Sequence, residues 1–253
     1  MGRLDTSGLS KNCQRPFRES EDIMDEKPKT TALDVGHTAI KAALSAIPIA
    51  GGPAAELFAA IVTPPIVERR DRWIQSIGEE LLQLKDTVAG FSAEGLSSNP
   101  QFITAVMHAT ASAARNHQQE KLDALRNAVL NVALSNEPDE DLQQIFFGYI
   151  DDLQPWHLRI LSFYQNPEEW FRRNQANKPN LEFGAPIHAL QTAFPELRSY
   201  SELVNQMVKD LHNRGLFGSD SLGGTMTKQG IFASRTTEIG NRFLRFISKP
   251  SIR

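Results

Sequence analysis

Apolar residues that recur three and four positions apart are the feature that most constrains the fold of this 253-residue chain. The clearest run lies between about residues 65 and 88, where the apolar positions follow the seam of a helical bundle. These positions are Trp73, Ile74, Ile77, Leu81, Leu84 and Val88. Similar spacing returns from Asn99 to Ile150 and from Pro155 to Phe171 without a convincing strand. The pattern predicts a mainly α-helical protein.

Three segments differ in character along the chain. Residues 1–31 have low hydrophobicity, many charges and no period, which predicts a disordered tail. Residues 32–153 carry the bundle pattern and are predicted to form a helical domain. Residues 154–253 are predicted to form a second domain. Inside the helical domain, Asn99-Pro100 predicts a helix start, because a capping residue precedes proline at the first helical position.

A stretch with few charges at residues 42–67 predicts an apolar helical hairpin. Its second helix is expected to end at Thr63-Pro64-Pro65. The residues assigned to the hairpin are Ile47, Gly51, Gly52, Leu57, Phe58 and Ile61. Glu56 divides this stretch into two uncharged runs, and each is shorter than the roughly 20 residues that span a bilayer. We therefore expect the hairpin to belong to the bundle core. The alternative is a hairpin that inserts into a membrane, with Arg69-Arg70-Arg72 on anionic lipid.

The last third of the chain is predicted to contain strands as well as helices. Two helices, at about 186–194 and 200–214, precede a strand at Leu216-Phe217 and a loop of Gly, Ser and Thr at 218–230. A second strand at 231–235 and a helix capped by Thr236 or Thr237 complete the series. Gly215 stands at the C′ position of the second helix, where glycine is favoured.

Two segments within this series resemble the winged-helix superfamily. Residues 210–217 (DLHNRGLF) are similar to the exit of a recognition helix into the wing. Residues 236–244 (TTEIGNRFL) are similar to the Thr-x-x-Gly-x-x-Phe/Leu helix that follows the wing in many bacterial regulators. The resemblance covers about residues 153–248 and implies a winged-helix domain of class α+β.

That resemblance implies a set of contacts to DNA or to a protein partner. They are Asn205, Lys209, His212, Arg214, Lys228, Arg235 and Arg242. Residues 185–253 hold nine Lys/Arg and five Asp/Glu, a net +4, against −7 for residues 1–184. The helix at 200–214 is nevertheless nearly neutral, and DNA affinity depends on neutralising phosphates. We therefore expect a protein-docking module first, and a DNA-binding transcriptional regulator as the alternative.

Catalytic and metal-binding motifs are missing from the sequence. It contains no phosphate-binding P-loop, no dinucleotide-binding Gly-x-Gly-x-x-Gly and no Gly-x-Ser-x-Gly. The single cysteine, Cys13, cannot form an intramolecular disulfide or a zinc site. The sequence thus predicts a protein that is not an enzyme, with no catalytic residue, cofactor, metal or small-molecule ligand. We expect it in the cytoplasm.

The whole-chain plan resembles uncharacterised bacterial proteins and abortive-infection proteins of the Abi-alpha kind. The resemblance implies a role in bacterial stress or phage defence. Taken together, the sequence predicts a non-catalytic interaction or regulatory protein that binds a protein partner or self-associates. A membrane-active helical effector is a further alternative.

Overall fold

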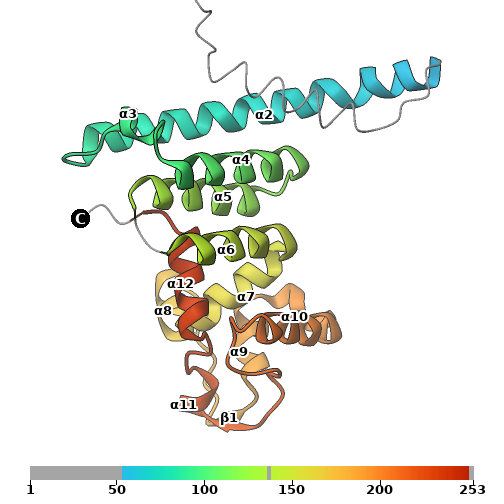
Figure 1. The fold of residues 1–253 in the computed structure, drawn as a ribbon. Helices are drawn as coiled ribbons and strands as arrows, with labels where there is room; N and C mark the ends of the chain where they lie inside the picture. Colours follow the sequence, from blue (N-terminus) through green and yellow to red (C-terminus); the bar gives the residue numbers. More distant parts are fainter. Residues whose placement is uncertain (1–52, 136–137, 251–253) are drawn as a thin grey trace, which may run out of the picture. The chain divides into compact units, whose positions relative to one another are not determined.

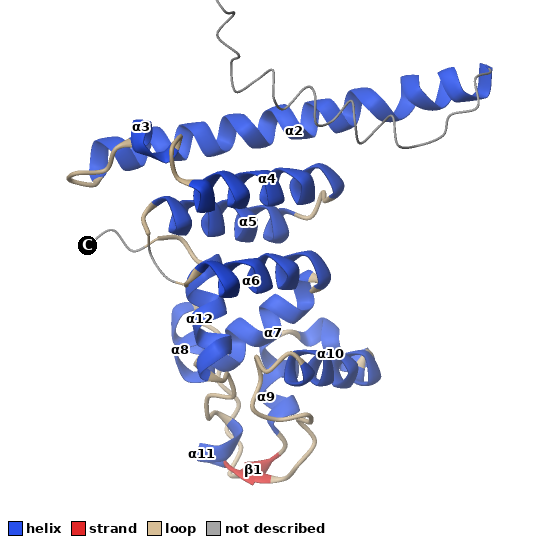
Figure 2. Cartoon of the chain, viewed as in Figure 1, coloured by secondary structure: helices blue, strands red, loops and turns tan. Residues whose placement is uncertain are grey.

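The computed structural model of the chain describes residues 53–135 and 138–250, which are mainly helical with one small sheet (Figure 1 and Figure 2). The prediction of a mainly α-helical chain is confirmed for these residues. The predicted tail at 1–31 lies outside them, as do Ile47, Gly51 and Gly52 of the predicted hairpin.

Helix α2 (Pro53–Thr87) is continuous through Pro64 and Pro65, so the predicted end of a helix at residues 63–65 is wrong. The two prolines remove the N–H groups that would donate to the carbonyls of Ala60 and Ile61. Both of those residues are exposed, so water can solvate the freed carbonyls without ending the helix.

The core of the helical part is made by α4 (Pro100–Arg115), α5 (Gln119–Ala133) and α6 (Glu140–Asp152), which contact one another pairwise (Figure 1). The short α3 (Ala93–Leu96) connects α2 to this group. Helix α2 buries Trp73, Ile77 and Leu84. The indole Nε1 of Trp73 donates to Thr110 Oγ1 of α4 at 3.1 Å, and this bond links the two helices.

Short polar residues begin several of the helices, as the sequence predicts for α4. The side-chain oxygen of Asn99 accepts a hydrogen bond from the N–H of Phe102, with Pro100 at the first helical position. Asp139 does the same for α6 and Thr237 for α12 (Glu238–Ile247). The predicted caps Asn99 and Thr237 are therefore confirmed.

The second part begins with α7 (Pro155–Gln165) and α8 (Pro167–Arg173), followed by α9 (Pro186–Ala193), the 3-10 helix η1 (Pro195–Ser199) and α10 (Ser201–Asn213). Buried Phe163 makes edge-to-face contacts with Tyr164, Trp170, Phe171 and Phe194. These aromatic pairs join α7, α8 and the end of α9 into one packed layer.

Gly215 ends α10 as predicted. Its φ is +72°, its N–H donates to His212 O, and the N–H of Leu216 donates to Leu211 O. This is the Schellman pattern, which satisfies carbonyls that a helix end leaves free. The chain then passes Phe217, which forms an isolated antiparallel bridge with Thr236.

The strands expected to form a wing differ in part from the structure. The small sheet pairs β2 (Met226–Thr227), which lies within the predicted loop, with β1 (Phe183–Gly184), a segment that precedes α9. The chain turns into α11 (Lys228–Ile231) directly after β2. The predicted strand at 231–235 is therefore wrong, because Thr227 caps a helical turn there by accepting from the N–H of Gly230.

Helix α12 packs against α5, so the C-terminal end of the described chain returns to the helical part (Figure 1). The Nδ2 of Asn131 on α5 donates to the carbonyls of Phe246 at 2.9 Å and Ser248 at 3.0 Å. Phe146 of α6 packs against Phe243 and Phe246. One hydrophobic core thus contains residues from both sides of the predicted boundary at 153 and 154.

Candidate functional site

Two of the predicted contact residues on α10 are free for a partner. Asn205 and Lys209 are exposed, and within the described ranges neither side chain makes a hydrogen bond or ion pair. His212, near the end of the same helix, has its Nδ1 2.9 Å from the carbonyl oxygen of Phe217. Arg214 lies over the ring of Tyr149 and 3.4 Å from Asp152, so its guanidinium contacts α6.

The other three predicted cations, Lys228, Arg235 and Arg242, also make contacts within the protein. Lys228 Nζ donates to Asn180 Oδ1 at 3.2 Å, and Arg235 donates to the carbonyl of Gly230 at 2.6 Å. Burial lowers the pKa of Arg235. Arg242 lies 3.8 Å from a carboxylate oxygen of Asp139. A phosphate would have to compete with these internal contacts, which removes much of the charge that a DNA surface needs.

The predicted hairpin residues that the structure describes lie on the surface. Leu57, Phe58 and Ile61 of α2 are 62%, 54% and 62% exposed, and the predicted first helix of the hairpin lies outside the described residues. Leu57 and Ile61 are opposite the buried side of α2, each about 160° around the helix from Ile77, and Phe58 is about 100° from it. No helix in the described ranges is both long and apolar enough to cross a membrane.

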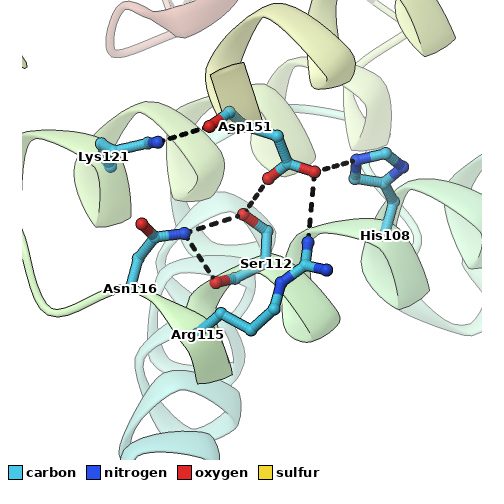
Figure 3. A network of polar contacts seen from close by, with 6 residues as sticks. All are labelled: His108, Ser112, Arg115, Asn116, Lys121 and Asp151. Atoms are coloured by element: carbon cyan, nitrogen blue, oxygen red, sulfur yellow. Dashed lines mark hydrogen bonds and ion pairs between the residues drawn. The ribbon is translucent and has the colours of Figure 1, made fainter. Parts of the chain in front are cut away.

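A polar network joins α4, α5 and α6 around Asp151, and within it Ser112 and Lys121 are buried (Figure 3). Ser112 donates to one carboxylate oxygen of Asp151. His108 Nε2 lies 3.2 Å from the other oxygen, and Arg115 lies 3.3 Å from it. The buried Lys121 donates to the backbone carbonyl of Asp151 at 2.7 Å, and burial lowers the pKa of Lys121.

The order of groups in this network does not match a serine nucleophile. In a catalytic triad the histidine lies between serine and carboxylate, whereas Ser112 and His108 both contact Asp151 directly. Ser112 is also completely buried. Each of these polar groups has a partner, which is the arrangement that stabilises a partly buried carboxylate such as Asp151. Among the described residues, no three His, Cys, Asp or Glu side chains gather as a metal site would require. We interpret the network as a structural link between three helices.

An open pocket of about 370 Å³ lies beside this network, between α2, α4 and α5. Arg69, Arg72 and Trp73 of α2 line one side, and Arg126 of α5 lines another. Asn116 connects the pocket to the network, since its Nδ2 donates to the carbonyl of Ser112 at 2.9 Å. No aspartate or glutamate lines the pocket, so the charged side chains of its lining are the three arginines.

The sequence did not predict this pocket. Arg69 and Arg72 belong to a cluster that was associated with lipid, and nothing linked them to Arg126, which is more than 50 positions away. The only sequence feature that points to the pocket is the position of Arg69 and Arg72 next to Trp73, which belongs to the predicted apolar seam. This feature predicts a pocket only when it is known which residues of α5 lie beside these arginines.

None of the protein-family models, curated proteins or solved structures compared with this chain matches it.

Proposed function

We propose that this chain is a non-catalytic interaction protein that self-associates through the N-terminal half of α2. The observation that carries the proposal is the exposed apolar group of Leu57, Phe58 and Ile61, here called the α2 patch. Large apolar side chains that gather on one exposed helix face are typical of binding surfaces. The structural role of the Asp151 network agrees with a non-catalytic protein.

A second copy of the chain is the occupant that the α2 patch fits best. Residues 57–67 carry no charge and extend along about 16 Å of helix. In an antiparallel pair of α2 helices centred on the patch, Leu57 of one copy lies against Ile61 of the other. Such a two-fold contact uses the same surface twice, and it brings no like charges together within the patch.

The size of the α2 patch predicts a weak dimer. Stable interfaces bury about 800 Å² on each partner, and three side chains cover much less than that. We therefore expect association in the micromolar range or weaker. The matched test residue is Leu82, which lies on the same helix and is 62% exposed, the same fraction as Ile61.

Sedimentation velocity across a concentration series tests this proposal. We expect the wild type and Leu82→Lys to show a sedimentation coefficient that rises with concentration, whereas Ile61→Lys stays monomeric. Far-ultraviolet circular dichroism confirms that the variants keep their helix content. A wild type that remains monomeric at all concentrations refutes self-association. Equal weakening by both lysine substitutions refutes the location of the interface.

In this proposal the C-terminal part is a docking module of winged-helix type. The support for that arrangement is the bridge between Phe217 and Thr236, together with the order α9, α10, α12 and the cap at Thr237. A DNA-reading role has less support, because Lys228 and Arg235 are held by internal contacts. The proposed setting in bacterial stress or phage defence rests on the sequence resemblance alone.

A further inference from the structure

The pocket between α2, α4 and α5 has free donors for an anion. Arg69 makes no hydrogen bond or ion pair within the described parts of the chain. Arg72 is paired only loosely, 3.7 Å from Glu68, and both side chains are 69% exposed. An exposed ion pair of this kind contributes little to stability, so Arg72 can turn to a ligand at small cost.

Arg126 gives the pocket a third guanidinium group. One of its terminal nitrogens pairs with Asp123, while its Nε is buried and has no hydrogen-bond partner. A buried N–H without a partner is unfavourable, and an anion in the pocket would satisfy it only if the Arg126 side chain moved toward the pocket. Gln119 also donates to Asp123, so that carboxylate is shared between two donors.

Part of the remaining wall of the pocket is apolar, and the rest is formed by the polar side chains of Ser76, Asn116, His117 and Gln119. Trp73 is almost fully buried, and its hydrogen bond to Thr110 fixes the plane of the indole. Leu122 and Ala113 continue the apolar surface. Small-molecule sites combine apolar walls with a few polar groups in this way, and the volume of about 370 Å³ is in their usual range.

We propose that this pocket binds a small organic phosphate, with the phosphate at Arg69, Arg72 and Arg126 and the apolar group against Trp73 and Leu122. A phosphate fits better than a carboxylate, because its doubly charged form offers three oxygens to several guanidinium groups at once. The site is separate from the α2 patch, so binding of the phosphate does not depend on self-association.

Phenyl phosphate is the ligand for the test, with inorganic phosphate as the comparison. Titration into ¹⁵N-labelled full-length protein at low salt is followed through the side-chain signals of its three tryptophans. The indole signal of Trp73 is assigned with Trp73→Phe. We expect that signal to shift in a saturable way, while the signals of Trp156 and Trp170 stay in place. Inorganic phosphate should bind at least about tenfold more weakly, because it lacks the apolar group.

Two arginine variants with the same change of charge complete the test. Arg69→Gln removes a pocket donor that has no structural contact, and we expect it to weaken phenyl phosphate binding about tenfold or more. Arg198→Gln is the control, since Arg198 is exposed on η1 and does not line the pocket. It should leave the affinity unchanged.

Several outcomes would overturn this proposal. No saturable shift of the Trp73 signal up to millimolar phenyl phosphate excludes the site. Equal affinity for phenyl phosphate and inorganic phosphate excludes the apolar subsite. Equal effects of Arg69→Gln and Arg198→Gln show that the protein attracts anions only by its general charge. Cosedimentation with phosphatidic-acid vesicles without binding of soluble phenyl phosphate would assign the arginines to a lipid surface instead.

Discussion

Gly240 and Gly78 are helical glycines in opposite surroundings. A Cβ atom on Gly240 of α12 would lie 2.2 Å from the carbonyl oxygen of Leu216. That oxygen also accepts the N–H of Thr237 at 3.1 Å, so the start of α12 is held closely against residue 216. A Cβ atom on Gly78 of α2 would meet nothing within 4 Å. The same substitution, Gly→Ala, therefore has opposite expected effects at the two positions.

The magnitudes follow from these contacts. Alanine in a helix is favoured over glycine by about 1 kcal/mol, and Gly78→Ala should raise the free energy of unfolding by about that amount or slightly less. At Gly240 the oxygen must retreat by about 1.2 Å to reach an ordinary contact of 3.4 Å. Such overpacking costs about 1–3 kcal/mol, and loss of the Thr237 hydrogen bond costs about 1 kcal/mol more. After the helix gain is subtracted, Gly240→Ala should lower the free energy of unfolding by about 1–3 kcal/mol.

Urea denaturation followed by far-ultraviolet circular dichroism measures both effects. We expect the midpoint to move to higher urea for Gly78→Ala and to lower urea for Gly240→Ala, with similar slopes. A midpoint for Gly240→Ala at or above that of the wild type would refute the close approach of α12 to Leu216. A Gly78→Ala variant that loses as much stability as Gly240→Ala would refute the assignment of the loss to that contact.

Three further predictions concern buried polar groups. Asn131→Asp should lower the free energy of unfolding by about 3 kcal/mol or more in urea denaturation, because a carboxylate would face the carbonyl of Phe246 in place of an amide donor; unchanged stability would contradict this. Asp151→Asn should lower it by about 1–2 kcal/mol by weakening the hydrogen bond from Ser112 and the pair with His108; a thermal midpoint equal to that of the wild type would count against the network as a structural link. Burial lowers the pKa of His157 below its ordinary 6.5, so the unfolded chain takes up this proton first and stability should fall as the pH drops below about 6.5. His157→Gln should flatten this part of the stability profile, and parallel profiles for variant and wild type would disprove the assignment.

The helices of the core were predictable because their sequence signals are local. Of the predicted seam, Trp73, Ile77 and Leu84 are buried, whereas Ile74 is 41% exposed. Asn99 caps α4 as predicted. Gly215 ends α10 because glycine adopts its positive φ without strain. In each case residues within a few positions determine the outcome, so no knowledge of the partner element is needed.

The errors arise where a local signal competes with the surroundings. Pro64 and Pro65 normally end a helix, yet the exposed carbonyls behind them can be solvated and α2 continues. The loop before residue 231 was expected to form a wing. A strand within this loop, Met226–Thr227, pairs instead with Phe183 and Gly184. Pairing between segments more than 40 residues apart leaves no local signal.

The arginines of α2 show why a site is harder to predict than a fold. From the sequence, Arg69, Arg70 and Arg72 form a single basic cluster on a helix. The structure separates them, because successive residues are about 100° apart around the helix. Arg70 is buried and pairs with Asp71, whereas Arg69 and Arg72 turn toward α5 and line the pocket with Arg126. The proposed phosphate site thus depends on a long-range feature, the packing of α2 beside α4 and α5, and not on the basic cluster itself.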